Sequence, residues 1–179
     1  SAGEVARRRA EVVAALRAAG APLRLVNGGG TGSFETTGLE EAVTELTAGS
    51  AFFAPALFDG YKAFHYQPAA GYAIEVTRKP APGIYTCAGG GYIASGEAGP
   101  AKQPVVWLPD GAALLPLEGA GEVQTPVRYN GPLAIGDPVI LRHAKAGELM
   151  ERFKSVLLVE GDQVVDEVPT YRGLGHCFY

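Results

Sequence analysis

Three consecutive glycines followed by small hydroxyl residues form the stretch with the clearest chemical potential, and residues 23–33 read LRLVNGGGTGS. Glycine loses more conformational entropy on folding than other residues, so a run of it indicates a special backbone requirement. One such requirement is close approach to an anion, which main-chain N–H groups can bind. The loop is neither a Walker A sequence, since no lysine follows its last glycine, nor a dinucleotide fingerprint in the usual register. An ordinary turn is the alternative. The predicted phosphate-binding residues are Gly28, Gly29, Gly30, Thr31, Gly32 and Ser33.

A second short loop lies after the next apolar run, where Gly49 and Ser50 follow Thr47 and Ala48. Two neighbouring strand-end loops that carry glycine and serine are the layout of a phosphate site in a βα-barrel. A tight exit from the strand is the alternative interpretation. We therefore predict Gly49 and Ser50 as further contributors to the same site.

His143 and Lys145 are two residues apart in the segment LRHAKAGE. In a strand this spacing places both side chains on the same face. A lysine on a buried face is unusual and indicates a charged cavity. A lone histidine is more often structural than catalytic, and that alternative stays open.

Two other segments are weaker candidates. Residues 87–99 are rich in glycine, which is typical either of a chain passing close to a cofactor or of a bulged connection. His176 and Cys177 are adjacent near the C-terminus, and adjacent residues of a strand point to opposite faces, so we predict no zinc site there.

The first part of the chain has the pattern of a parallel α/β sheet. Residues 4–19 predict an amphipathic helix, which Gly20 and Pro22 end. A strand at 23–26, a helical turn or two at 38–43 and a strand that ends in a loop over 44–53 follow. Two strands are too few to close a barrel, so this part is incomplete by itself.

From about residue 67 the pattern changes to short β-like runs separated by glycine and proline, which favour a compact antiparallel sheet or a small barrel. The pair Gly161-Asp162 predicts a hairpin turn. The predicted strands lie within 71–79, 83–89, 104–111, 121–129, 137–144 and 155–171. We thus expect the C-terminal part of a βα-barrel over 1–66 and an all-β domain over 67–179.

Composition narrows the class of protein. With 47% hydrophobic and 19% charged residues in 179, the chain can bury a core. A net charge of −4 argues against a nucleic-acid partner or a polybasic membrane contact. Its two cysteines, Cys87 and Cys177, lack a C-x-x-C pattern and are expected to be reduced thiols of a cytoplasmic protein.

Taken together, GGGTGS after one strand, VTELTAGS on the next, GDPVILRHAKAGE in the β part and the terminal VPTYRG resemble a known family. This is the D-threonine aldolase and D-serine dehydratase group of pyridoxal-phosphate (PLP) enzymes with the alanine-racemase-like fold. The likeness extends through essentially the whole chain and includes bacterial proteins named amino acid deaminase/aldolase.

The resemblance implies that PLP lies at the mouth of a TIM-type barrel, with its phosphate held by residues 28–33 and with Gly49-Ser50 nearby. It also implies His143 and Lys145 as catalytic residues. His143 matches a histidine that ligates a divalent metal in some members together with an acid or cysteine two residues on. A charged ammonium cannot ligate a metal, so Lys145 argues against a metal here, and its charge is a candidate replacement for that of the ion.

None of the five lysines matches the Schiff-base lysine of the family, which lies on an early barrel strand. We therefore expect the chain to be the C-terminal portion of a longer lyase, inactive without its N-terminal barrel segment, with a D-amino acid substrate and a homodimeric state. Aldol cleavage and elimination both stay open. The alternatives are a racemase of the same fold and a non-catalytic fragment or β-domain interaction module.

Overall fold

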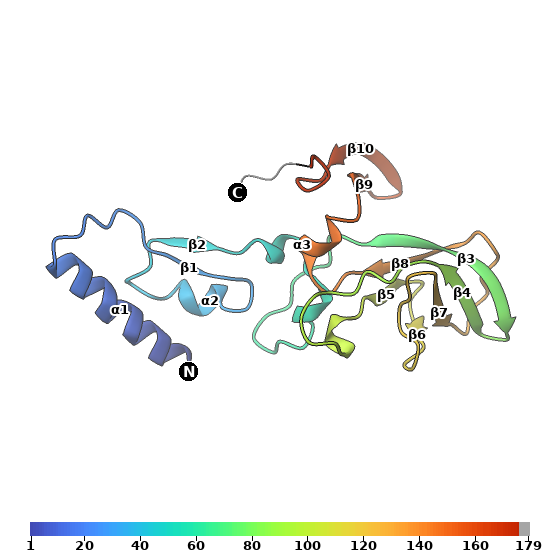
Figure 1. Ribbon diagram of the computed structural model, residues 1–179, viewed down its shortest axis with the longest axis horizontal. Helices are drawn as coiled ribbons and strands as arrows, with labels where there is room; N and C mark the ends of the chain where they lie inside the picture. Colours follow the sequence, from blue (N-terminus) through green and yellow to red (C-terminus); the bar gives the residue numbers. More distant parts are fainter. Residues whose placement is uncertain (176–179) are drawn as a thin grey trace. The chain divides into compact units, whose positions relative to one another are not determined.

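The computed structural model describes residues 1–175 and divides the chain into two compact units, Ser1–Phe52 and Phe53–Tyr179 (Figure 1). None of the helices in the described part of the chain combines the length and the apolar character needed to cross a membrane. Each unit is described separately below.

The first unit contains one long helix and a two-stranded parallel sheet. Its elements are α1 (Ala2–Ala18), β1 (Asn27–Gly29), α2 (Phe34–Thr37), β2 (Glu45–Thr47) and the 3-10 turn η1 (Ser50–Phe52). The helix predicted over 4–19 is thus confirmed. Its apolar face is mostly uncovered, because Val13 is buried while Val5, Val12 and Leu16 are exposed.

Two local predictions in this unit are wrong. The strand begins at Asn27 instead of Leu23, since the N–H of Val26 donates to the Thr44 hydroxyl (2.8 Å) and leaves the regular ladder to start one residue later. Residues 38–43 are turns, and the short helix α2 precedes them. Gly38 is a poor helix former, and Leu39 is almost fully exposed, so no packing stabilises a helix there.

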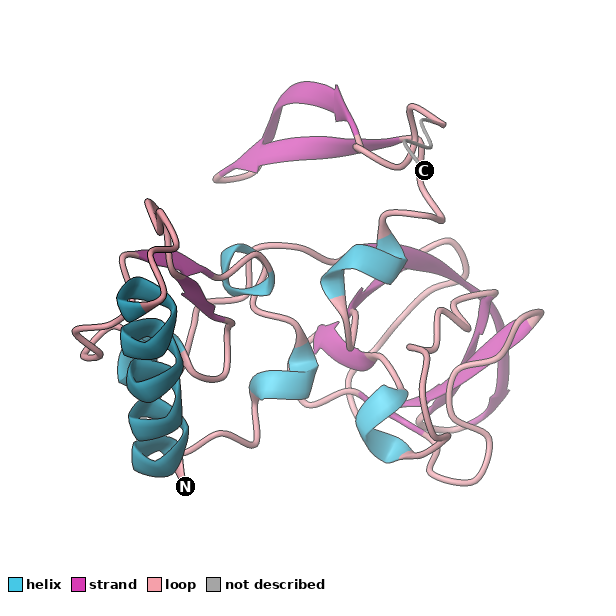
Figure 2. Cartoon of the chain, turned by 60° about the vertical axis from the view of Figure 1, so that its left-hand side comes forward, coloured by secondary structure: helices cyan, strands magenta, loops and turns pink. Residues whose placement is uncertain are grey.

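The second unit is built on a six-stranded antiparallel sheet in the order β5-β8-β3-β4-β7-β6. The edge strands β5 and β6 also contact each other, so the sheet is nearly closed, and Figure 2 shows its curl. The predicted antiparallel β domain is therefore confirmed. The strands of this sheet are β3 (Tyr72–Ala81), β4 (Ile84–Ala88), β5 (Val105–Leu108), β6 (Ala113–Leu114), β7 (Gln124–Arg128) and β8 (Pro138–Arg142).

The core of this sheet follows from alternation. In β3 the side chains of Tyr72, Ile74 and Val76 are buried and those between them are exposed, which is the period of two expected for one buried face. Val76 pairs with Cys87 of β4 in the ladder. The fully buried hydrophobic side chains are Val76, Cys87, Val127, Val139 and Leu141.

The remaining elements of this unit are short or separate from the six-stranded sheet. The 3-10 turns η2 (Ala56–Phe58) and η3 (Pro100–Lys102) and the helix α3 (Ala146–Leu149) connect strands. The last two strands, β9 (Ser155–Glu160) and β10 (Gln163–Pro169), form the predicted hairpin around Gly161-Asp162 as a two-stranded sheet of their own.

Candidate functional site

The predicted phosphate loop and the Gly49-Ser50 loop leave the same edge of the parallel sheet. In the ladder Asn27 pairs with Glu45 and Gly29 with Thr47, so both strands end at the same level (Figure 1). The structure therefore brings the carboxyl ends of β1 and β2 side by side, with a glycine-containing loop after each. This is the edge at which parallel α/β sheets bind ligands.

The loop after β1 requires glycine at Gly30, whose φ of 132° is a conformation that residues with a side chain rarely adopt. The Gly30 carbonyl accepts a hydrogen bond from the Ser33 N–H (3.0 Å), which closes a turn, and Thr31 is buried within it. A Cβ added to Gly30 would have one neighbour within 4 Å, the Ser33 hydroxyl at 3.9 Å. The backbone is thus open to an approaching group on this side.

Gly49 resembles Gly30 in its surroundings, because a Cβ added there would have no neighbour within 4 Å. Its carbonyl accepts a hydrogen bond from the Phe52 N–H (3.3 Å), and Ser50 begins η1. Both loops therefore combine a fixed turn with an uncovered backbone, which is the arrangement a phosphate cradle needs.

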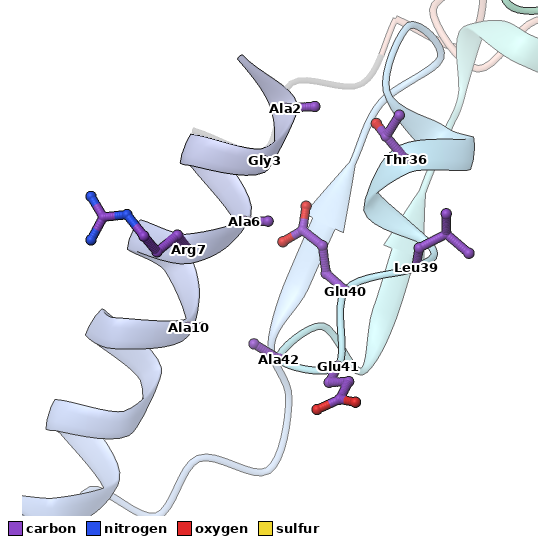
Figure 3. Close-up of a pocket in the computed structure, with 10 residues that line it drawn as sticks. All are labelled: Ala2, Gly3, Ala6, Arg7, Ala10, Thr36, Leu39, Glu40, Glu41 and Ala42. Carbon is purple, nitrogen blue, oxygen red and sulfur yellow. The ribbon is translucent and has the colours of Figure 1, made fainter.

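A shallow groove of about 400 Å³ in the same unit lies between α1 and residues 36–42 (Figure 3). Small residues of α1, among them Ala6 and Ala10, form one wall, and Leu39 and Glu40 form the other. Arg9 pairs with Glu40 beside it. The predicted phosphate-binding residues do not line this groove.

His143 directly follows β8 and is almost completely buried, with 1% of its surface exposed. Burial, and secondarily the positive charge of Arg142, lowers the pKa of His143 to about 4, so the imidazole is neutral at pH 7. Within residues 1–175 neither ring nitrogen has a hydrogen-bond partner. Because buried polar atoms are normally paired, His143 has an unused donor and an unused acceptor.

His143 and Lys145 line the same small cavity, which has a volume of about 10 Å³. A space of this size holds one water molecule or one ion, and it is far too small for an amino acid or a cofactor. The cavity is lined by Tyr92, Ile93, Ala94, His143, Lys145, Glu148, Leu149 and Arg152.

Lys145 is fixed by the loop that covers this cavity. Its Nζ donates a hydrogen bond to the Ser95 carbonyl (3.0 Å) and lies 3.4 Å from the Ser95 hydroxyl. The Glu148 carboxylate accepts a hydrogen bond from the Ser95 N–H (2.9 Å). Ser95 is therefore held from both sides by residues of the segment that follows β8.

The sequence pattern indicated Lys145 but gave no indication of Glu148 or Ser95. Glu148 lies three residues after Lys145, a spacing that places two side chains near each other on a helical turn, and α3 provides such a turn. Ser95 carried no comparable signal, because its position depends on the path of a long connection.

The second glycine-rich segment, residues 87–99, serves packing. A Cβ added to Gly91 would lie 2.5 Å from the carbonyl carbon of Gly121, which is closer than real side chains come. Nearby, the Tyr72 hydroxyl donates to the Gly90 carbonyl (2.8 Å), and Tyr92 stacks edge-on against Tyr72 at 4.9 Å. The bulged connection, one of the two interpretations left open, accounts for these contacts.

Cys87 is a free thiol in the sheet core, where burial raises its pKa to about 11. His176 and Cys177, for which we predicted no zinc site, lie outside the described residues. Within residues 1–175 no group of three or more His, Cys, Asp and Glu side chains could hold a metal ion.

Comparison with protein-family models gives no match, and comparison with curated proteins gives none either. Among solved structures, the chain is similar to D-threonine aldolase from Filomicrobium marinum, with a TM-score of 0.78 and 21% identity. That match covers 97% of this chain and 48% of the aldolase.

The chain is also similar to D-threo-3-hydroxyaspartate dehydratase from Delftia sp. HT23, with a TM-score of 0.62 and 23% identity over 93% of this chain and 50% of that one. A variant of D-threo-3-hydroxyaspartate dehydratase in a metal-free form matches with a TM-score of 0.64, again at 23% identity and with the same coverage. The predicted resemblance is therefore confirmed at the level of the fold. The chain spans about half the length of these proteins.

Proposed function

We propose that this chain is the C-terminal portion of a PLP-dependent lyase that acts on a D-amino acid, of the D-threonine aldolase or D-serine dehydratase type. The observation that carries the proposal is the pair of uncovered glycine loops at the carboxyl ends of the parallel strands β1 and β2, in a chain with the fold of D-amino-acid lyases. The two interpretations of the glycine run, a turn and a phosphate cradle, are compatible here, since the turn at Gly30 holds the backbone open.

The residues of these loops fit the phosphate group of PLP. Main-chain N–H groups of residues 30–32 and the hydroxyls of Thr31, Ser33 and Ser50 are hydrogen-bond donors, and a phosphate dianion accepts several at once. When bound, PLP withdraws electrons from the amino acid α-carbon and so makes a bond to that carbon easier to break. The role assigned to the loops is to hold and orient the cofactor through its phosphate.

His143 and Lys145 are the side chains that we place toward the substrate in the longer protein. The unused nitrogens of the neutral His143 imidazole can donate or accept one proton, which is the task of a general acid or base. The Lys145 ammonium has three N–H donors, so its bond to Ser95 leaves others for a substrate hydroxyl or carboxylate. These roles are predictions about the assembled enzyme.

Three features support a missing N-terminal barrel segment. The parallel sheet has two strands of three residues each, which is too small to be stable alone. Val5, Val12 and Leu16 of α1 expose apolar surface that a barrel would cover. The matched lyases are about twice as long as this chain. We propose that this segment supplies the Schiff-base lysine, that the enzyme is cytoplasmic, and that it is a homodimer.

The phosphate cradle can be tested on the polypeptide that contains this chain together with its upstream sequence, by calorimetric titration with PLP and with pyridoxal, which lacks the phosphate. We expect PLP to bind at least about tenfold more tightly than pyridoxal, a difference of about 1.4 kcal/mol. Replacement of Thr31 by Val should remove most of this difference, whereas replacement of Thr77 by Val, on an exposed position of β3, should leave it. Equal affinities for PLP and pyridoxal would contradict the cradle.

The activity is tested on the polypeptide that contains this chain together with its upstream sequence. Aldol cleavage of D-threonine is followed through release of the aldehyde, and elimination from D-serine through release of the keto acid. Formation of either product, with loss in the His143→Ala variant, would support a lyase. A polypeptide that binds PLP and forms neither product, nor the L-enantiomer of its substrate, would favour the interaction module.

A further inference from the structure

The cavity beneath residues 92–95 has the histidine of a metal site and a cation where a second ligand would be. His143 is buried with both ring nitrogens unpartnered in the described chain, which is the state of an imidazole that lacks its ligand. Lys145 lies two residues on and lines the same cavity. Whether a divalent ion fits in this cavity depends on the atoms that could coordinate it.

The donors available in the cavity do not suit a divalent ion. Zinc takes three or four ligands from imidazole, thiolate and carboxylate groups, and among residues 1–175 this cavity offers His143 and Glu148. The Glu148 carboxylate already accepts the Ser95 N–H, and it lies in the field of Lys145 and Lys102, which help to lower its pKa. The Lys145 side chain lines this cavity, and its charged Nζ, bonded to Ser95, repels a second cation that approaches the cavity.

Hydrogen bonds to Ser95 fix the position of the Lys145 ammonium. A metal site would not need these bonds. Its Nζ contacts the carbonyl and the hydroxyl of Ser95, while Glu148 holds the Ser95 N–H. Charge-assisted hydrogen bonds therefore connect residues 92–95 to the segment around α3, through Ser95 on one side and Lys145 and Glu148 on the other. A metal ion would make the same kind of cross-link through coordination.

We propose that this cavity is a metal-free counterpart of a metal centre, in which Lys145 stands where a second metal ligand would be and its ammonium, held at Ser95, keeps divalent ions from His143. The bridge to Ser95 and Glu148 fixes the position of that charge. The exclusion depends on the cavity alone, so it can be tested on the 179-residue chain whatever reaction the longer protein performs.

The decisive experiment measures Zn²⁺ binding by calorimetry to the tag-free chain and to the Lys145→Asp variant. Replacement of Lys145 by Asp removes the repelling charge and leaves imidazole and two carboxylates around one space. We expect the unaltered chain to show no Zn²⁺ binding that depends on His143. The Lys145→Asp variant should bind one Zn²⁺ at least tenfold more tightly than the unaltered chain, and the added His143→Ala substitution should abolish that gain.

Lys102→Asp is the matched control, because Lys102 approaches Gly96 in the same covering segment and does not line the cavity. This variant changes the net charge by the same amount and should gain no His143-dependent site. Lys145→Cys provides a second test with a thiolate ligand if the Asp variant unfolds, as judged by the fluorescence of Trp107. Stoichiometric Zn²⁺ binding to the unaltered chain that His143→Ala removes would overturn the proposal, and so would equal affinities in the Lys145→Asp and Lys102→Asp variants.

Discussion

The two glycine-rich segments look alike in sequence and differ in structure. In residues 28–33 the backbone at Gly30 faces open space, whereas in residues 87–99 the backbone at Gly91 lies against that of Gly121. The first segment needs glycine at Gly30 because of its φ and because the backbone there is left uncovered. The second segment needs glycine at Gly91 because two backbones pack closely. A run of glycines therefore shows only that the backbone is free of side chains. The tertiary surroundings decide whether a ligand or another part of the backbone occupies the space that side chains would have filled.

The same difference, between an uncovered and a packed backbone, distinguishes the candidate phosphate loops from the cavity beside His143. The loops of the first unit are open at a strand edge and suit a large anion. The second glycine-rich segment lines a small cavity beside His143 that has room for one water or ion. Substitutions in the two regions should consequently affect different measurements.

The largest effect is expected for Gly91→Ala. The added Cβ would lie within 2.8 Å of three backbone atoms of Gly121 and Glu122, and backbone cannot rotate away as a side chain can. Overpacking of this kind should lower the free energy of unfolding of the second unit by about 3 kcal/mol. Urea unfolding followed by Trp107 fluorescence measures it. Gly99→Ala is the control, since a Cβ there has no neighbour within 4 Å and the φ of 173° is extended backbone. Similar losses in both variants would remove the distinction.

The next largest effect is the pH dependence of the free energy of unfolding that follows from the burial of His143. The pKa of His143 is about 4 in the folded chain, below the ordinary value of 6.5, so the unfolded chain binds more protons between these values. Stability due to the neutral imidazole is full above pH 6.5 and is lost as the pH falls toward 4. We expect a loss of about 2 kcal/mol between pH 7 and pH 5.

The free energy of unfolding of the His143→Leu variant should no longer depend on pH in this range. The His65→Gln variant, altered at an exposed histidine, should keep the dependence. An unaltered slope in His143→Leu would mean that the imidazole has the same pKa in the folded and the unfolded chain and that the cavity is open to water.

The smallest effects are expected in the open loops. Gly30→Ala should destabilise the β1–β2 ladder by about 1–2 kcal/mol, because alanine at a φ of 132° is strained. Gly49→Ala meets no neighbour and should change stability by less than about 0.5 kcal/mol. Hydrogen exchange of the amides of Asn27–Gly29 and Glu45–Thr47 measures both. A severe loss in Gly49→Ala would show that this loop is packed like residues 87–99.

Much of the β architecture could be predicted from the sequence because the strands have a strong local signal. Tyr72, Ile74 and Val76 alternate with polar residues, and Gly161-Asp162 fixes a hairpin turn. The short helix α2 and the two-residue strand β6 were missed or misplaced, since elements of two to four residues have too few positions to show a period.

The candidate site divides in the same way. The loop after β1, the loop after β2 and the pair His143 and Lys145 were visible because glycine, histidine and lysine stand out in an apolar context. Ser95 and Glu148 were not visible as partners of Lys145, since the contact to Ser95 spans fifty positions of the chain.

The amino-acid sequence by itself determined the order of the strands along the chain, the turns between them and the residue types available for chemistry, because these depend on neighbours within a few positions. The tertiary structure decided which glycines face open space, how small the cavity beside His143 is and what holds the Lys145 ammonium. Those properties depend on which distant segments meet, and long-range packing sets such meetings.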